Sequence, residues 1–418
     1  MIHRYTEADS TSVSVVTEPA KIDHRSIAVL GALTICAYGC WYYSFGVLLN
    51  PIKADTGWSE STLAASFSAG TVLIGLSALF GGRLLDQAGH RIVFVLGGTF
   101  GTAGLLAASF AGSVSVFFAG AAIGLGAFGS LGFYHVTMTT AVRLNPQAPQ
   151  QAIAVLTIWG ALASAIFLPG SDWLEANFGW RATVRILALT TGTTFLIAAI
   201  ALPTLQGTKA VTRPSALSLL GATVSTRGPR LFTVAVACGG LAMSTMLVYQ
   251  VPVMTAAGLG TATAASMAGL RGFCQLGGRI PLNPIVNRIG RDRALVLAFS
   301  AIAAGGALLA VANTVPVAIA FAVVAGFGIG AFSPLQGMKA EELFDRDQLG
   351  ATMGAYGAVL LLAGSLGPLL AGMLTEQTGD PRGAALIVVV ASTGAVIATV
   401  LLATDNKRSA MSALGATS

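Results

Sequence analysis

The chain has 418 residues, of which 54% are hydrophobic types and only 10% are charged, and its mean hydropathy is +0.77. A soluble globular chain is roughly a quarter charged, so this composition excludes large water-facing domains and indicates an integral membrane protein. The net charge of +6 does not indicate a nucleic-acid partner, because the basic residues lie singly between apolar runs, as they do in loops beside membrane spans.

Apolar runs long enough to cross a bilayer recur along the whole chain. A transmembrane helix needs about 20 mostly apolar residues. Twelve runs meet this length, at 27–50, 63–85, 92–111, 114–142, 152–170, 183–203, 231–253, 264–285, 294–312, 315–338, 349–374 and 383–403. We therefore predict an all-α membrane protein with twelve transmembrane helices.

The polar segments around these runs predict the domains and the orientation. The stretch 206–230 has four basic residues, no acid and two prolines, which suits a cytoplasmic linker between two six-helix bundles at 27–205 and 231–404. The tails are 1–26 and 405–418. Most of the 23 lysines and arginines then lie on the side of the tails, and the loops of the other side hold only Lys53, Arg181 and Arg382. By the positive-inside rule, both termini are cytoplasmic.

Two loops at equivalent places in the two halves carry a related pattern. Residues 82–91 are G-R-L-L-D-Q-A-G-H-R, and residues 284–293 are P-I-V-N-R-I-G-R-D-R. Both resemble the G-x-x-x-D-R-x-G-R-R loop of the major facilitator superfamily. Two copies six spans apart indicate an internally duplicated transporter, with the two-bundle fold of that superfamily.

The charged residues of these loops suggest a conformational latch. Asp86 can accept hydrogen bonds from the N-terminus of a neighbouring helix and pair with Arg91, which would hold the bundles together on the cytoplasmic side in one state. In the second loop Arg288 and Arg291 are the corresponding bases. Asn287 replaces the acid there, so we expect a weaker latch. The alternative is a charge cluster that only stops membrane insertion.

Other stretches resemble one group within the superfamily. Residues 44–60, 169–181 and 342–372 are similar to segments of the monocarboxylate and oxalate/formate transporters. This chain departs from those carriers in having Tyr43 where animal carriers place a lysine, and from many drug and sugar carriers in having Gly120 where they place an arginine. The resemblance therefore implies a transporter without giving its substrate.

The eighth run carries charges that are costly in a bilayer. An ionisable residue in a span costs roughly 2.5–3.5 kcal/mol and is a functional hypothesis by default. Arg271, Gln275 and Arg279 are spaced i, i+4, i+8, which places them on one helix face. Arg279 lies nine positions before Arg288, so about 14 Å into the membrane at 1.5 Å per residue.

Arg279 also matches the position of the substrate-binding arginine in the related carriers. A guanidinium holds a carboxylate by two parallel hydrogen bonds, so we predict that Arg279 binds the substrate carboxylate; the alternative is a structural contact between helices. Arg271 is either an outer recruiting charge or a residue that extends toward the headgroups. Animal carriers have an acid where Gln275 lies, and no run contains an acid clear of its ends. An anionic substrate is therefore expected.

The fourth run places polar residues at mid-membrane depth. Tyr134 aligns with a tyrosine of the related carriers and could bind a carboxylate or a hydroxyl. His135 could carry a proton, and the alternative is a neutral histidine bonded to a backbone carbonyl. Further candidates for the polar side of the site are Tyr38, Tyr42, Tyr249, Gln250 and Tyr356.

These features predict a secondary active transporter of small monocarboxylates or related organic anions. We expect proton-coupled symport by alternating access, in a monomer of the plasma or inner membrane. The first alternative is an efflux carrier or exchanger for a larger amphipathic anion or drug. A sensor would need a sizeable soluble domain, and an enzyme would need a catalytic set or a metal cluster. The sequence has neither, so no cofactor or metal is expected.

Overall fold

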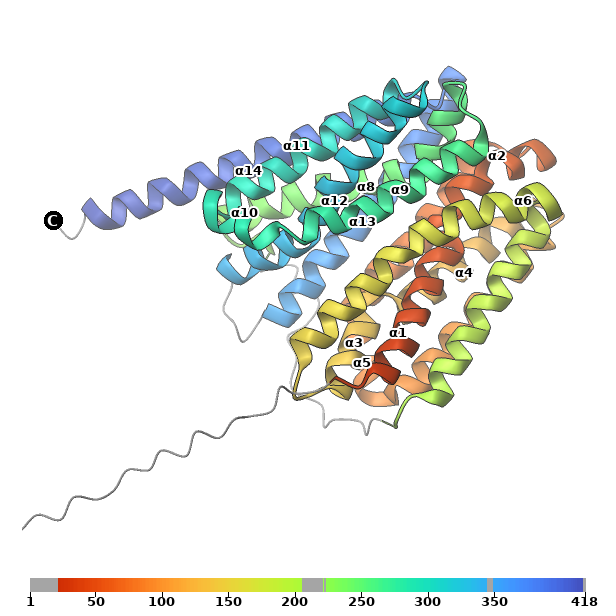
Figure 1. Cartoon of the computed structure of the whole chain (residues 1–418), viewed down its shortest axis with the longest axis horizontal. Coiled ribbons are helices and arrows are strands. Elements are labelled where there is room, and N and C mark those ends of the chain that lie inside the picture. The colour runs from red at the N-terminus through yellow and green to blue at the C-terminus, as the bar shows by residue number, and fades with distance from the viewer. Residues whose placement is uncertain (1–21, 205–220, 222, 344–348, 416–418) are drawn as a thin grey trace, which may run out of the picture.

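The computed structural model describes residues 22–204, 221, 223–343 and 349–415, and within these ranges it leaves the side chains of 79–83, 86, 349–353 and 406–415 undescribed. Every regular element in this part of the chain is a helix (Figure 1). The first half contains α1 (His24–Ala37), η1 (Tyr38–Tyr43), α2 (Phe45–Thr56), α3 (Glu60–Ser109), α4 (Val114–Gly132), α5 (Tyr134–Leu144) and α6 (Pro149–Ala201). The second half contains α8 (Arg227–Ala256), α9 (Thr261–Arg279), α10 (Leu282–Ile289), α11 (Arg291–Ala310), α12 (Val315–Leu343), α13 (Leu349–Thr378) and α14 (Gly383–Gly415).

The number of membrane helices agrees with the sequence. Ten described stretches are long and apolar enough to cross a membrane. One of them, α6, has two arms that meet at Gly179, where φ is 74°. The helix α9 adds 19 residues, and its arginines and glutamine make it less apolar than the others. Twelve membrane helices result, as predicted.

The two halves share a backbone pattern that reveals the duplication. Each positive φ angle of the described chain falls on a glycine in a connection between helices. These glycines occupy matching places in the two halves, and the matched pairs are Gly57 with Gly258, Gly89 with Gly290, and Gly179 with Gly379. Gly89 and Gly290 have nearly the same angles, with φ of 72° and 85° and ψ of 164° and 161°. A side chain is strained at such angles, so glycine belongs to the geometry of both repeated loops.

Helices extend further than the apolar runs that predicted them. The first helix begins at His24, because Asp23 caps it by accepting from the backbone N–H groups of Arg25 and Ser26. The helix α8 begins at Arg227, and α14 continues to Gly415. Parts of the predicted tails and linker are therefore helical, while 1–21, 205–220 and 222 lie outside the described residues. The orientation of the termini stays a prediction.

Helices of each half pack mainly on one another, and the halves meet along three pairs, α3 with α13, α6 with α9, and α2 with α8. The closest approaches use small residues. A Cβ on Gly46 of α2 would lie 2.5 Å from the Val248 carbonyl oxygen of α8, and a Cβ on Gly272 of α9 would overlap Ser164 of α6. At the opposite end of the halves, α5 and α10 lie apart (Figure 1). The halves are thus closed on each other at the end that carries Gly57.

Candidate functional site

Arg279 lies at the contact between the two halves. It is the last residue of α9, just before the chain bends at Pro281. Its Nη1 donates to the backbone carbonyl of Thr157 in α6 at 3.2 Å, and the Tyr134 hydroxyl donates to the same carbonyl at 3.4 Å. The guanidinium and the Tyr134 hydroxyl also interact with each other. The Nε of Arg279 is buried and has no hydrogen-bond partner, so a cationic donor remains free for an anion.

Four tyrosine rings cluster in the first half, and two of them, Tyr43 and Tyr134, interact with Arg279. Tyr38 stacks on Phe133 with ring centroids 3.7 Å apart, and its centroid lies 5.2 Å from that of Tyr134. Tyr42 and Tyr43 meet edge to face at 5.6 Å. These four tyrosines are only half-buried although they lie in the middle of spans. The site is therefore an aromatic cluster beside a cation, on the side of the first half that faces the second.

The aromatic cluster depends on an irregular first span. Residues 38–43 form a π-helical segment, η1, between α1 and α2. Ser44 stabilises its end by donating to the Gly39 carbonyl five residues earlier, at 2.7 Å, and its hydroxyl lies 2.6 Å from that of Ser171. Extra residues in one turn bring Tyr38, Tyr42 and Tyr43 into mutual contact. Such π-bulges are frequent at functional sites, and the hydropathy of the run gave no sign of this one.

Arg271 is buried rather than extended toward headgroups. Its side chain is 3% exposed, and its Nε donates to the Gln250 side-chain oxygen of α8 at 2.7 Å. It interacts electrostatically with Tyr42 and Tyr43. Gln275, one turn further along α9, is also buried. Arg271 therefore lies at the same interface as Arg279, and Gln275 is packed inside the second half against α12.

The fourth span is broken in the middle of the membrane. The helix α4 ends at Gly132, Phe133 is extended, and α5 begins at Tyr134. The break leaves carbonyls without helical partners, and the His135 Nε2 lies 2.8 Å from the Ser130 carbonyl oxygen. This is the structural alternative considered above for His135, and its role in proton transfer stays a prediction.

Two predicted site tyrosines lie elsewhere. Tyr356 is buried between α13 and α8, where its hydroxyl donates to the Pro229 carbonyl at 3.5 Å and its ring meets Phe232 at 4.8 Å. Tyr249 is fully buried and interacts with Glu60 of α3. The structure brings neither residue together with Arg279. A tyrosine in a span can serve either in helix packing or in ligand binding. The sequence pattern does not distinguish these two roles.

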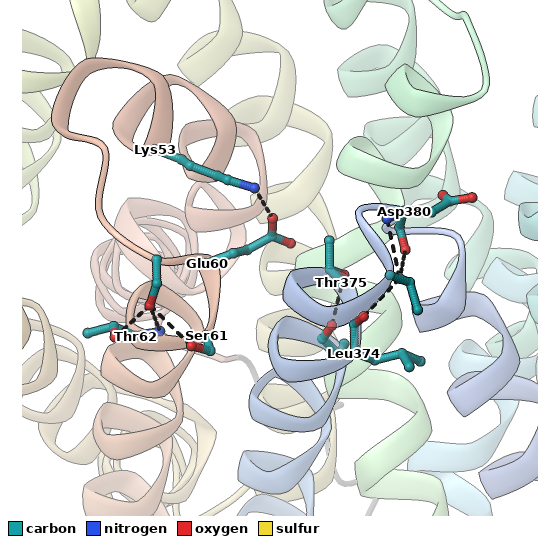
Figure 2. A network of polar contacts seen from close by, with 10 residues as sticks. Lys53, Glu60, Ser61, Thr62, Leu374, Thr375 and Asp380 are labelled. Atoms are coloured by element: carbon teal, nitrogen blue, oxygen red, sulfur yellow. Dashed lines mark hydrogen bonds and ion pairs between the residues drawn. The ribbon is translucent and has the colours of Figure 1, made fainter.

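The contact of Tyr249 reveals a carboxylate that the sequence analysis passed over. Glu60 is only 3% exposed, and its Oε2 lies 2.8 Å from the Lys53 Nζ (Figure 2). Its other oxygen, Oε1, and the Tyr249 hydroxyl are both buried without a hydrogen-bond partner. Glu60 is the first residue of α3 and lies between the predicted runs 27–50 and 63–85, so it was not among the charges expected within the membrane. Closure of the two halves is what buries it.

The second repeated loop is tied to its own half. Lys339 of α12 is fully buried and pairs with Asp292 at 2.6 Å and with Glu342 at 2.8 Å. Arg291 donates to the Met338 carbonyl at 3.1 Å and lies 3.7 Å from Glu342. Asp292, two residues after Gly290, thus supplies an acid in this loop, where Asn287 had suggested a weak latch.

The remaining predicted latch residues show no hydrogen bond or ion pair between the halves in the described part of the structure. Arg91 and Arg288 are exposed. The side chain of Asp86 lies outside the described part of the structure. The latch between the halves therefore stays a prediction.

The fold and this interface define a membrane transporter with a cationic site between two repeated halves. The profile of the Major Facilitator Superfamily matches residues 30–272 and 251–416, and the chain belongs to this family. Its members are transporters and not enzymes, as expected from the sequence.

Individual relatives agree with this assignment. Human monocarboxylate transporter 11 is 26% identical over 344 residues, which cover 78% of this chain and 70% of the relative. Rat monocarboxylate transporter 13 is 23% identical over 362 residues, or 85% of this chain and 81% of the relative. Among solved structures, that of a nucleoside transporter superposes with a TM-score of 0.76 at 16% identity, covering 90% of this chain and 98% of the other. The resemblance to monocarboxylate transporters is confirmed.

Proposed function

We propose that the protein is a secondary active transporter of monocarboxylates or closely related organic anions. The observation that carries this proposal is the buried, unpartnered Nε of Arg279 at the contact between the halves. No ion pair links Arg279 to an acid among the described residues. An arginine within a membrane span that has no counter-charge is costly, and a substrate carboxylate would neutralise it by a two-point hydrogen bond.

Transport would proceed by alternating access around Arg279. With both termini cytoplasmic, as the distribution of basic residues predicts, the closed end that carries Gly57 faces outward and the described conformation faces the cytoplasm. Inverted or duplicated halves rocking about a midplane site are the usual means of such transport. The protein would act in this way as a monomer of the plasma or inner membrane.

Proton symport is the coupling that physical arguments favour. An anion entering a cell against an inside-negative potential is opposed by about 2.3 kcal/mol per 100 mV. One proton carried with each monocarboxylate removes this electrical cost. Uptake should then rise as external pH falls and should be insensitive to an imposed membrane potential.

The test is uptake of labelled monocarboxylates by proteoliposomes under separate pH and potential gradients. Accumulation driven by an inward proton gradient supports the proposal. Transport that follows the potential at fixed pH would contradict symport, and transport that needs an internal counter-anion would favour exchange. The Arg279→Gln variant is the control for the site.

The aromatic cluster favours a second candidate, an exporter or exchanger of a larger amphipathic anion. Tyr38, Tyr42, Tyr43 and Tyr134 would offer ring surface that a short acid does not use. Outward transport of a preloaded hydrophobic acid, without uptake of short acids, would favour this function over the first.

A further inference from the structure

The tyrosines of this chain are concentrated at the site. The sequence has only seven, and four of them, Tyr38, Tyr42, Tyr43 and Tyr134, form the cluster beside Arg279. A chain that needed only to bind a short acid would require donors near the guanidinium, not several rings in contact. The aromatic composition of the site therefore indicates the chemistry of the substrate beyond its carboxylate.

The rings differ in how much of their surface is already used. Tyr38 has one face covered by Phe133, with the ring planes only 8° apart. Tyr42 similarly overlaps Phe67, at 5.6 Å and 29°. Tyr43 meets its neighbours only edge to face or tilted, at 5.6 Å and 6.2 Å, and its side chain is partly exposed. Tyr43, like Tyr134 with its single tilted contact to Tyr38, thus has no stacked neighbour and keeps a ring face for a ligand.

Tyr43 also lies within electrostatic range of the two arginines. Its hydroxyl interacts electrostatically with both Arg271 and Arg279, and its ring contacts Tyr38, which in turn contacts Tyr134. The Nε of Arg271 donates a hydrogen bond to the Gln250 side-chain oxygen at 2.7 Å, whereas the Nε of Arg279 has no hydrogen-bond partner. Of the clustered tyrosines, Tyr43 and Tyr134 are the two that interact with Arg279, so a ligand with its carboxylate on Arg279 has these two rings beside it.

We infer that the substrates are aryl or arylalkyl monocarboxylates, with an aromatic ring bound against Tyr43 and Tyr134 and the carboxylate on Arg279. This inference rests on the proposed function, because it assumes that Arg279 binds a carboxylate. Aromatic rings prefer offset or edge-to-face contacts with one another, and the cluster already shows both arrangements. A two- or three-carbon acid bound to Arg279 would be too short to contact the ring faces of Tyr43 and Tyr134.

The test compares two ligand classes on the same purified protein. Benzoate, phenylacetate and phenylpyruvate form one class, and acetate, lactate and pyruvate form the other; binding is measured by calorimetry and by inhibition of labelled uptake. The aryl acids should bind at least about tenfold more tightly, since one or two ring contacts supply that factor. Short acids binding as tightly as aryl acids would overturn the inference while leaving the proposed function intact. If neither class binds, the proposed function fails as well.

A pair of variants separates the ring from the hydroxyl. Tyr43→Leu removes the ring and should weaken aryl acids about tenfold, and short acids by a clearly smaller factor. Tyr43→Phe keeps the ring and should retain the preference. Unchanged aryl affinity in a folded Tyr43→Leu protein would contradict the inference. Tyr356→Phe, far from Arg279, is the matched control and should leave both classes unaffected.

Discussion

Arg279 is the residue on which the proposed site depends most directly. Arg279→Lys keeps the positive charge but replaces a planar fork by a single ammonium group. Arg279→Gln removes the charge and keeps a neutral amide group. The two variants therefore separate the contribution of charge from that of two-point geometry.

The magnitudes follow from the contacts. A hydrogen bond to a charged group contributes about 1.5–3 kcal/mol, and each 1.4 kcal/mol is about a tenfold change in affinity. Losing one arm of the fork in Arg279→Lys should therefore weaken carboxylate binding at least about tenfold. Arg279→Gln should weaken it by about 100-fold or more. Tyr134→Phe removes a neutral hydroxyl that shares the Thr157 carbonyl with Arg279, and should cost only about 0.5–1.5 kcal/mol.

The assay must separate binding from folding, because Arg279 also joins the two halves through Thr157. Calorimetric titration gives the affinity, and thermal unfolding without ligand gives the stability of each variant. We expect a small loss of ligand-free stability in both variants and a graded loss of affinity in the order Tyr134→Phe, Arg279→Lys, Arg279→Gln. A well-folded Arg279→Gln protein with the affinity of the wild type would refute the assignment.

Three further predictions concern residues around the site. Gly272→Ala should weaken closure of the halves at the Gly57 end, because the added Cβ overlaps Ser164, and a second change, Ser164→Gly, should restore closure. Distances between spin labels on the two halves measure the closure. Unchanged distances in Gly272→Ala would contradict this prediction. Glu60→Gln should also favour separation of the halves at that end, because a neutral amide interacts less strongly than the carboxylate with Tyr249 of the other half, whereas Asp380→Asn, in a loop outside the spans, should not. In His135→Gln the amide can replace the ring donor to the Ser130 carbonyl, so the pH dependence of uptake should persist; its loss would identify His135 as the proton carrier.

Asp380 is a suitable control because its charge is constant over the pH range of transport assays. Hydrogen bonds from Arg382 hold the pKa of Asp380 below its ordinary value of 3.8. A lowered pKa means that the carboxylate loses its charge only as the pH falls toward the folded-state pKa. Any change in uptake between about pH 5 and 8 must therefore come from other groups.

The sequence was informative where the signal is long and repetitive. Apolar runs predicted twelve membrane helices because a bilayer demands about 20 such residues for each. The repeated loop predicted the duplication, which Gly89 and Gly290 display in their backbone angles. Arg279 could be singled out because a charge at that depth is rare. Each of these features can be recognised without knowing how helices face one another.

Features that depend on contacts between helices were beyond the sequence. Tyr249 and Tyr356 could not be told from site residues, since a tyrosine in a span serves equally in helix packing and in binding. Glu60 was passed over because its burial comes from a helix of the other half. Predicted helix ends differed by several residues, because caps such as Asp23 extend a helix beyond its apolar run.

The two backbone irregularities of the first half meet at the site. Non-helical backbone at membrane depth is tolerated only where protein or a water-filled cavity surrounds it. Tyr38 belongs to the π-helical segment of the first span, and Phe133 is the extended residue that breaks the fourth span. Their rings stack at 3.7 Å, so the two irregularities lie side by side, and Tyr134 begins the next helix directly against Arg279. Regular helices would place these side chains in different directions. The irregular backbone is therefore best explained by the aromatic cluster that it assembles beside Arg279.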